Sequence, residues 1–475
     1  IYVLWLNSEP NTETKQGTLI TLAFEHKTPH QVDVIKDSLK IHQQLNVTFA
    51  PPVVKNQSLF DSPFVTWQTL AKESNDTWVL ATRLYDTDNG GVLRFHIQGV
   101  YRGWQGHIFA VSQGERVEQF NQLLTLLADS EYFSVESEQA ALTKLTLLHA
   151  TTNENILITH QLIEKNYQLG YLDRAAALTD TLLESEPNKV DLGLLHLLKT
   201  KIVLRNTNWQ SASSNISTAF KTFDELNLPH LESLARIQQA WYEVHNNNYP
   251  QIRQSLNIAI NKARKANEPL QEMLAHLIQS SLASKGHQPV LMRNELDSAT
   301  KLFELHHLGE EHQIPIFYTL ASATLTLEEK VSHYLSIQSR PFSPLYRDKF
   351  YYSAKFLRDT FIENKQWEEA IATIKPWQSK SFVYLSEAHI ALAKQQISMG
   401  IQAAVKAFRR AQIDYDLQDA LNAALLLLQH EQQGTDSDSS SEYIDYIKQN
   451  ASHKWLRDNK PMLEKLSLFK GVSDF

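Results

Sequence analysis

The feature of this 475-residue sequence that most constrains its fold is a helical pattern that recurs about every 40 residues. Four segments align with offsets of 37, 40 and 40 residues when their first residues are placed in register. The aligned starts are Leu172, Trp209, Tyr249 and Pro289, and ten residues later stand Leu182, Ala219, Ala259 and Ala299. Two later segments, Lys365–Trp377 and Gln396–Gln412, continue the pattern.

An amphipathic segment lies beside each of these units, so each pair is predicted to form a helical hairpin. A small residue in the second helix lets the first helix approach closely. Because a lone hairpin cannot bury both of its faces, the hairpins are expected to stack into a right-handed superhelix. The period is longer than the 34 residues of an ideal tetratricopeptide repeat. We therefore predict an all-α, tetratricopeptide-like superhelix over residues 131–433.

The preceding region, residues 17–130, alternates strand-like and helix-like segments and is predicted to be an α+β domain of order β-α-β-α-β-β-β-α. Asn89-Gly90 is a signal for a tight hairpin turn. The predicted strands are Thr18–Phe24, Asn46–Val54, Trp78–Asp86, Val92–Gly103 and Gln105–Ser112. The predicted helices are His30–Leu45, Pro63–Ser74 and Arg116–Asp129.

Both ends of the sequence differ from these two regions. Ile1–Leu6 is apolar but far shorter than the roughly 20 residues that span a bilayer. We expect residues 1–16 to be the end of a transmembrane segment and a linker, although a short buried strand or an apolar tail fits equally well. Residues 434–442 are predicted to be a polar loop, and residues 443–475 to form capping helices.

Composition excludes several kinds of site. The sequence has no Cys, so disulfides, zinc-thiolate sites and cysteine nucleophiles are ruled out. Its 53 acidic and 45 basic residues give a net charge of −8, which argues against nucleic acid as the main partner of this chain. Because phosphate-binding glycine loops and nucleophile elbows are also missing from the sequence, we expect neither an enzyme nor a cofactor.

One histidine cluster is a candidate site. His306, His307 and His312 stand near Glu310 and Glu311, but their spacing on a helix is poor for metal ligands. A solvated helix end is the simpler interpretation. The alternative is a response to acid, because histidine titrates near physiological pH.

An aromatic cluster is the second candidate. Tyr351, Tyr352 and Phe356 occupy one predicted helix. Packing between hairpins explains them most simply. They are also suited to binding a partner protein, since tyrosine is common at binding hot spots.

The order of elements resembles the sensory region of CadC-type regulators, the membrane-bound relatives of the ToxR group. The stretches that carry the resemblance are Thr18–Phe24, Val32–Pro52 and Trp78–Ser112, that is, a strand, a helix with its following strand, and a meander. The resemblance implies a periplasmic, non-catalytic sensor on a single-pass inner-membrane protein. It also implies an N-terminal winged-helix DNA-binding domain that this chain does not contain. The periplasmic disulfide of the family's best-known member has no counterpart here.

This resemblance sets the expected function. A ligand, a pH change or a partner protein is expected to shift a conformational equilibrium or a homodimerisation equilibrium. A membrane segment ending near Leu6 is then expected to pass the signal to the DNA-binding domain. The alternative is a soluble helical-repeat scaffold that binds peptides or partner proteins.

Overall fold

The structure is a computed structural model that describes residues 3–6, 18–24, 47–50, 77–87, 90–98 and 103–466. The last range has gaps at 131, 133–134, 136–137, 153–154, 170, 207–208, 246–247, 307, 325, 341–345, 375–379, 415–416, 432–436 and 452. The predicted helices His30–Leu45 and Pro63–Ser74 lie outside the described residues.

The chain divides into two compact units. The first contains Ile1–Tyr167, Leu172–Leu204 and Asn208–Ala323. The second contains Thr324–Phe475 and two short pieces at 168–171 and 205–207. The division therefore falls inside the region 131–433 that was predicted as one array.

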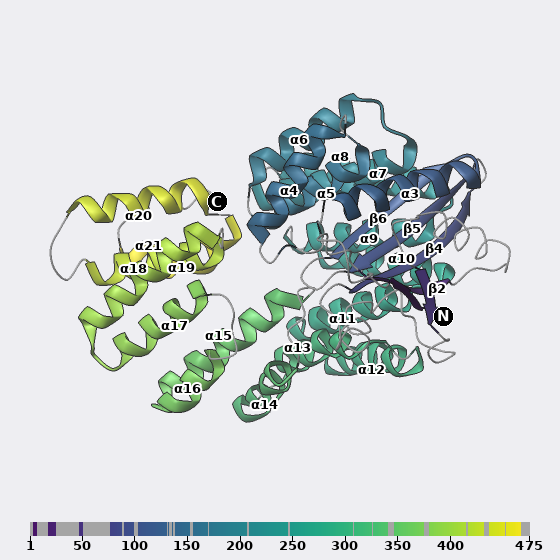
Figure 1. Ribbon diagram of the computed structural model, residues 1–475. Helices are drawn as coiled ribbons and strands as arrows, with labels where there is room; N and C mark the ends of the chain where they lie inside the picture. The colour runs from purple at the N-terminus through teal and green to yellow at the C-terminus, as the bar shows by residue number, and fades with distance from the viewer. Residues whose placement is uncertain are drawn as a thin grey trace. The chain divides into compact units, whose positions relative to one another are not determined.

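The first unit begins with a four-stranded sheet of order β2-β4-β5-β6 (Figure 1). Its strands are β2 (Thr18–Phe24), β4 (Thr77–Thr87), β5 (Gly90–Gln98) and β6 (Gly103–Ala110). The last three form the predicted antiparallel meander, and β2 pairs in parallel with β4. A separate antiparallel pair joins β1 (Val3–Leu6) to β3 (Val47–Ala50), so Val3–Leu6 is a strand, one of the alternatives that the sequence left open.

One face of the sheet is covered by helix α3 (Gln113–Asp129). The rings of Phe95 on β5 and Phe120 on α3 lie 5.3 Å apart and are almost fully buried. Opposite Phe95 stands Gly106 on β6, where a Cβ atom would lie 2.3 Å from the Phe95 ring. Glycine at this position therefore lets the aromatic ring pack flat across the neighbouring strand.

The rest of the first unit is a series of helices whose starts match the sequence repeat (Figure 1). The four aligned residues Leu172, Trp209, Tyr249 and Pro289 are the first residues of α6, α8, α10 and α12. The helices are α4 (Glu138–Thr151), α5 (Ile156–Leu169), α6 (Leu172–Glu184), α7 (Lys189–Asn206), α8 (Trp209–Glu225), α9 (Pro229–His245), α10 (Tyr249–Ala266), α11 (Pro269–Lys285), α12 (Pro289–Leu305) and α13 (Gln313–Ala323), with the short 3-10 helix η2 (Glu310–His312).

Neighbouring helices form the predicted hairpins, with α9 against α10 and α11 against α12. The aligned alanines Ala219, Ala259 and Ala299 are completely buried, as close helix packing requires. These observations confirm the predicted fold class, an α+β region followed by tetratricopeptide-like paired helices.

Many of the helices end in a left-handed residue that is not glycine, which explains how the chain manages with only 14 glycines. Asn227 and Asn267, for example, have φ values of 51° and 54°. The next backbone N–H in each case donates back to the last turn, from Leu228 to Phe223 O (2.9 Å) and from Glu268 to Ala263 O (2.9 Å). This is the Schellman motif, which satisfies carbonyl groups left open at a helix end. The same left-handed conformation occurs at Glu186, His287, Lys365 and Gln395.

The second unit continues with helical hairpins of the same kind. Its helices are α14 (Leu327–Gln338), α15 (Arg347–Glu363), α16 (Trp367–Ile374), α17 (Lys380–Ala393), α18 (Ile397–Asp414), α19 (Leu417–Glu431), α20 (Ser437–Asn450) and α21 (His453–Lys465). Helix α20 starts at Ser437, inside the segment expected to be a loop. Ser and Asp are poor in helix interiors but favourable at helix starts, so composition alone suggested a longer loop than the structure has.

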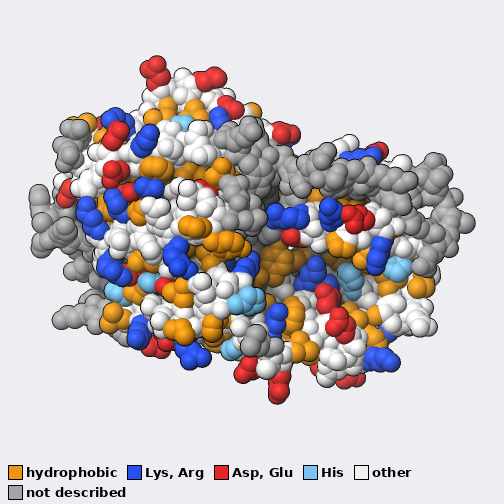
Figure 2. All heavy atoms as spheres, turned by 180° about the vertical axis from the view of Figure 1, so that it is seen from behind, with side chains coloured by type: hydrophobic (Ala, Val, Ile, Leu, Met, Phe, Trp, Pro, Cys, Tyr) orange, Lys and Arg blue, Asp and Glu red, His pale blue; other side chains and the backbone are white. Residues whose placement is uncertain are grey.

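The surface mixes charged and apolar side chains. Figure 2 shows Lys, Arg, Asp and Glu scattered over one face, with small groups of hydrophobic side chains between them. Large exposed apolar residues include Trp241, Tyr249 and Val290. Within the described part of the chain, every helix is too short or too polar to cross a bilayer.

Candidate functional site

The candidate site lies where the sheet meets a row of turns between successive hairpins of the first unit. Asn188, Leu228 and Glu268 directly precede α7, α9 and α11, and they are 40 residues apart in sequence. The repeat therefore places them at equivalent positions along one edge of the array. Val92 of β5 packs there against Leu228 and neighbouring apolar residues of α7, α8 and α9.

Glu268 is the centre of a buried ion cluster. It is the N-cap residue of α11 and is 1% exposed. Its carboxylate accepts hydrogen bonds from Arg83 and Tyr85 of β4, and from Arg94 Nη1 of β5 at 2.9 and 3.0 Å. Burial would raise the pKa of this carboxyl, but Arg94 and Arg83 outweigh burial and hold it below its ordinary value. A single carboxylate from the array thus joins two strands of the sheet to it.

A stack of aromatic rings continues from this cluster. The Tyr85 ring lies 3.6 Å from that of His230 on α9 and nearly parallel to it, and His107 of β6 follows 5.7 Å from His230. Burial, with a contribution from Arg94, lowers the pKa of His107 to about 3 and that of His230 well below its ordinary value. Burial also lowers the pKa of His160 on α5 to about 4. All three imidazoles are therefore uncharged at neutral pH.

Several polar atoms of this interface are buried without a hydrogen-bond partner in the structure. They are both ring nitrogens of His230 and the Nε2 atoms of His107 and His160. Nearby, Asp191 of α7 accepts a hydrogen bond from Asn188, and burial raises its pKa to about 7. Unpaired buried polar atoms cost free energy that apolar packing would avoid. The sheet is thus held to the array by a polar contact sensitive to charge.

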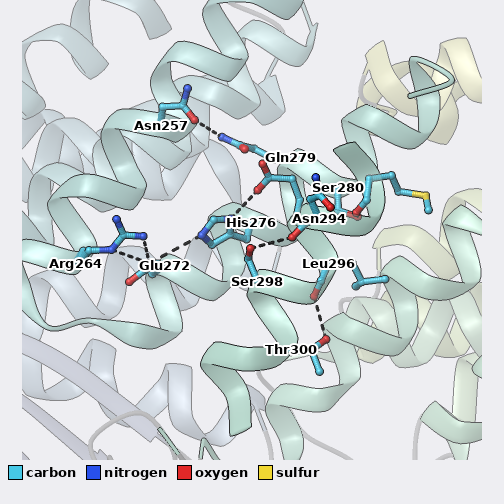
Figure 3. A network of polar contacts seen from close by, with 12 residues as sticks. Asn257, Arg264, Glu272, His276, Gln279, Ser280, Asn294, Leu296, Ser298 and Thr300 are labelled. Atoms are coloured by element: carbon cyan, nitrogen blue, oxygen red, sulfur yellow. Dashed lines mark hydrogen bonds and ion pairs between the residues drawn. The ribbon is translucent and has the colours of Figure 1, made fainter. Parts of the chain in front are cut away.

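A second polar network ties three helices of the same unit together (Figure 3). His276 of α11 lies between two carboxylates, with its Nδ1 2.6 Å from Glu295 of α12 and its Nε2 3.9 Å from Glu272 of its own helix. Arg264 of α10 donates to Glu272 at 2.6 Å. Burial would lower the pKa of His276, but the two carboxylates outweigh burial and raise it to about 9. The imidazolium is therefore a permanent structural cation at neutral pH.

The predicted histidine site is divided among different surroundings. His306 is half-buried at the end of α12, His307 lies outside the described residues, and His312 is fully buried in η2. His312 Nε2 lies 3.9 Å from Glu311 Oε1, and burial raises the pKa of Glu311 to about 7. No group of three or more His, Asp and Glu among the described residues has the geometry of a metal site. A response of these residues to acid stays a prediction.

The predicted aromatic site is partly built into the core of the second unit. The Tyr351 hydroxyl is buried, donates to Asp419 at 2.8 Å and accepts from Asn422 at 3.1 Å. Phe356 is half-buried, and its ring lies 4.9 Å from that of Tyr334. Tyr352 is 40% exposed and is therefore the residue of the three that is best placed to meet a partner.

Comparison with known proteins adds one distant likeness. No protein-family model and no curated protein matches the chain. A similar solved structure is that of a signal transduction ATPase with numerous domains (STAND) and a tetratricopeptide repeat sensor, from Pyrococcus horikoshii. It is 13% identical, with a TM-score of 0.37, over 75% of this chain and 50% of that chain. The chain thus matches about half the length of that protein. The assignment of tetratricopeptide-like repeats here rests on the helical hairpins themselves.

Proposed function

We propose that this chain is the non-catalytic sensor and interaction region of a membrane-anchored transcriptional regulator. It would lie in the periplasm and pass a ligand, pH or partner signal to a winged-helix DNA-binding domain outside this chain. The observation that carries the proposal is the polar contact between sheet and helical array around Glu268. A contact held by buried charges responds to added charge far more strongly than apolar packing does.

The signal would act on the seating of the sheet, by which we mean its contact with the helical array around Glu268. Protonation of His107 or His230 would add positive charge beside Arg94, where one carboxylate now balances two guanidinium groups. A ligand or partner that prefers the unseated sheet would have the same effect, because only differential affinity shifts such an equilibrium. The change in seating would then alter a conformational or homodimerisation equilibrium that the membrane segment transmits.

The test is the topology and control of the full gene product. We expect about 20 apolar residues upstream of Ile1, preceded by a basic winged-helix region, because Val3–Leu6 is a strand and a spanning helix needs about 20 residues of its own. Alkaline phosphatase fused after Phe475 should be active only if this end is periplasmic. A signal peptide or lipobox upstream, or an inactive fusion, would refute the proposal.

A soluble helical-repeat scaffold for peptides or partner proteins is the second candidate. It is favoured by strand β1, because Val3–Leu6 pairs with β3 and does not continue a helix. A scaffold would bind its partner equally well when detached from any membrane segment, and sheet variants such as Glu268→Gln would leave transcription unchanged.

A further inference from the structure

A histidine and an aspartate meet where α5 packs against α7 in the first unit. Nε2 of His160 on α5 lies 3.8 Å from Oδ1 of Asp191 on α7, and the two side chains are 16% and 5% exposed. Nε2 of His160 is buried and has no hydrogen-bond partner within the described part of the chain. A small rotation of either side chain brings these two atoms within hydrogen-bonding distance. The packing of the two helices therefore places an unpartnered ring nitrogen opposite a carboxyl group.

The Asp191 carboxyl is positioned by the start of its own helix. Oδ1 of Asn188 accepts hydrogen bonds from the backbone N–H groups of Val190 and Asp191, both at 3.0 Å, so Asn188 caps α7. The Asn188 amide in turn donates to Oδ2 of Asp191. Oδ2 is thus occupied, and Oδ1 is the oxygen that faces His160.

The carboxyl group of Asp191 is buried without a counter-charge. Within the described part of the chain, no lysine or arginine forms an ion pair with it. The lysines of α7 lie closer to the surface and each pairs with another acid. These pairs are Lys189 with Glu225, Lys199 with Asp180 of α6, and Lys201 with Glu164 of α5.

The other titratable groups near His160 do not supply that charge. His107 of β6 is close enough to His160 for their charges to interact, but burial keeps it uncharged at neutral pH. Arg94 of β5 is engaged in the ion cluster around the α11 cap. His149 of α4 bonds through Nδ1 to the residue before His160, at 2.9 Å. Lys165 stands five residues after His160 and so lies on a different face of α5.

Burial favours the uncharged form of both members of the pair. It raises the pKa of Asp191 to about 7, against the hydrogen bond from Asn188, and it lowers the pKa of His160 to about 4. The N-terminus of α7 also favours the carboxylate, but that effect is smaller than the cost of a buried charge without a counter-ion. Between these two values the carboxyl is protonated and the imidazole is neutral. An O–H group then faces the unpartnered ring nitrogen.

We propose that Asp191 and His160 form a buried proton-binding site that joins α5 to α7. The carboxylate takes up one proton and becomes a carboxylic acid, whose O–H donates to Nε2 of His160, while the imidazole gains no charge. The sign is opposite to that of the sheet contact. Mild acid adds a hydrogen bond within the helical array here, whereas charge on His107 or His230 weakens the contact of the sheet. This site belongs to the array itself and depends neither on the regulator nor on the membrane.

Hydrogen exchange of the full chain between pH 5 and pH 8, corrected for intrinsic exchange rates, tests the site. Asp191→Asn keeps the shape of the side chain and a donor but cannot ionise. The folded chain holds the proton more tightly than the unfolded chain, so the contribution of Asp191 to stability is lost as the pH rises toward 7. The equilibrium constant for opening of α5 and α7, divided by that of Asp191→Asn, should therefore rise roughly a hundredfold from pH 5 to pH 8. Asp180→Asn, at a position that is 51% exposed, is the control and should give a constant ratio.

Nuclear magnetic resonance of the unmodified chain with 15N-labelled histidine locates the proton, even if Asp191→Asn folds poorly. The His160 ring signals are assigned by their loss in His160→Asn. The Nε2 signal should shift as a neutral nitrogen that accepts a hydrogen bond when the pH falls from 8 to 5. A ratio of opening constants that does not change with pH, an Nε2 signal that does not move, or the signature of an imidazolium above pH 5 would overturn the site. The topology test is independent of all three results, so failure of this site is distinguishable from failure of the proposed function.

Discussion

Removing the charge of Glu268 tests the polar contact between sheet and array most directly. Glu268→Gln keeps the shape of the side chain but leaves Arg83 and Arg94, at 4% and 8% exposure, without their counter-charge. Removing one partner of a buried ion pair costs about 3–5 kcal/mol. Glutamine can still accept a hydrogen bond, and Glu268 makes no side-chain cap to α11, so the lower end applies. We expect a loss of about 3 kcal/mol in the free energy of unseating the sheet.

Hydrogen exchange followed by mass spectrometry measures this loss locally. Amides of β4, β5 and the first turn of α11 should lose protection by roughly a hundredfold, which is the equivalent of about 3 kcal/mol. Amides of the second unit should be unchanged and serve as the internal reference. The matched control is Glu225→Gln, because Glu225 pairs with Lys189 at 3.5 Å on the surface, with both side chains about two thirds exposed. If the amides of β4, β5 and the first turn of α11 are equally protected from hydrogen exchange in Glu268→Gln and Glu225→Gln, the carboxylate of Glu268 does not hold the sheet against the array.

Three further predictions concern stability. Lys365→Gly and Gln395→Gly should each raise the free energy of unfolding by about 1 kcal/mol, because both residues are exposed and have a left-handed backbone conformation. Lys285→Gly, in the last turn of α11, is the control and should lower the free energy of unfolding by about 1 kcal/mol. Thermal melts of the three variants check both expectations. His276 has a folded-state pKa of about 9, above the 6.5 of the unfolded chain, so its contribution to stability should be complete below pH 6.5 and lost as the pH rises through 9. Denaturant titrations of the unmodified chain and of His276→Gln should therefore converge at pH 10, and a constant difference would contradict this assignment. His160 has a folded-state pKa of about 4, below the 6.5 of the unfolded chain. Its contribution to the stability of the first unit should therefore be complete above pH 6.5 and be lost as the pH falls toward 4. In His160→Asn, the free energy of unfolding should depend less on pH between 6.5 and 4.

The repeat was predictable because its signals are local. Trp209 and Tyr249 each begin a helix, and the small residue ten positions later packs against the neighbouring helix of the hairpin, so one period fixed several helix starts at once. The pairing of β4 and β5 followed from the Asn-Gly signal in the same way. The segment at Ser437 was misjudged because Ser and Asp suit both loops and helix starts.

The candidate site was not predictable from the same signals. Arg94 meets Glu268 across 174 residues of sequence, and that contact depends on how the sheet rests on the array. One clue was present, since Glu268 stands 40 residues after the apolar Leu228 at an equivalent position of the repeat. A charged residue at a position where the preceding repeat unit has leucine indicates a contact with something outside the helical repeat, which here is the sheet. Buried Tyr351 fits the simpler interpretation of the aromatic cluster, packing between hairpins, while a binding role for the exposed Tyr352 stays a prediction.

The contact of the sheet with Leu228 and Glu268 has a consequence for how this architecture can evolve. Repeat proteins usually gain or lose hairpins by duplication and deletion. Here a hairpin inserted or removed between α7 and α11 would move Glu268 away from Arg83 and Arg94, and the sheet would lose its ion pairs with the helical array. In related proteins, the number of hairpins between α7 and α11 should therefore be constant. Differences in the number of hairpins should be confined to the part of the array that follows α12.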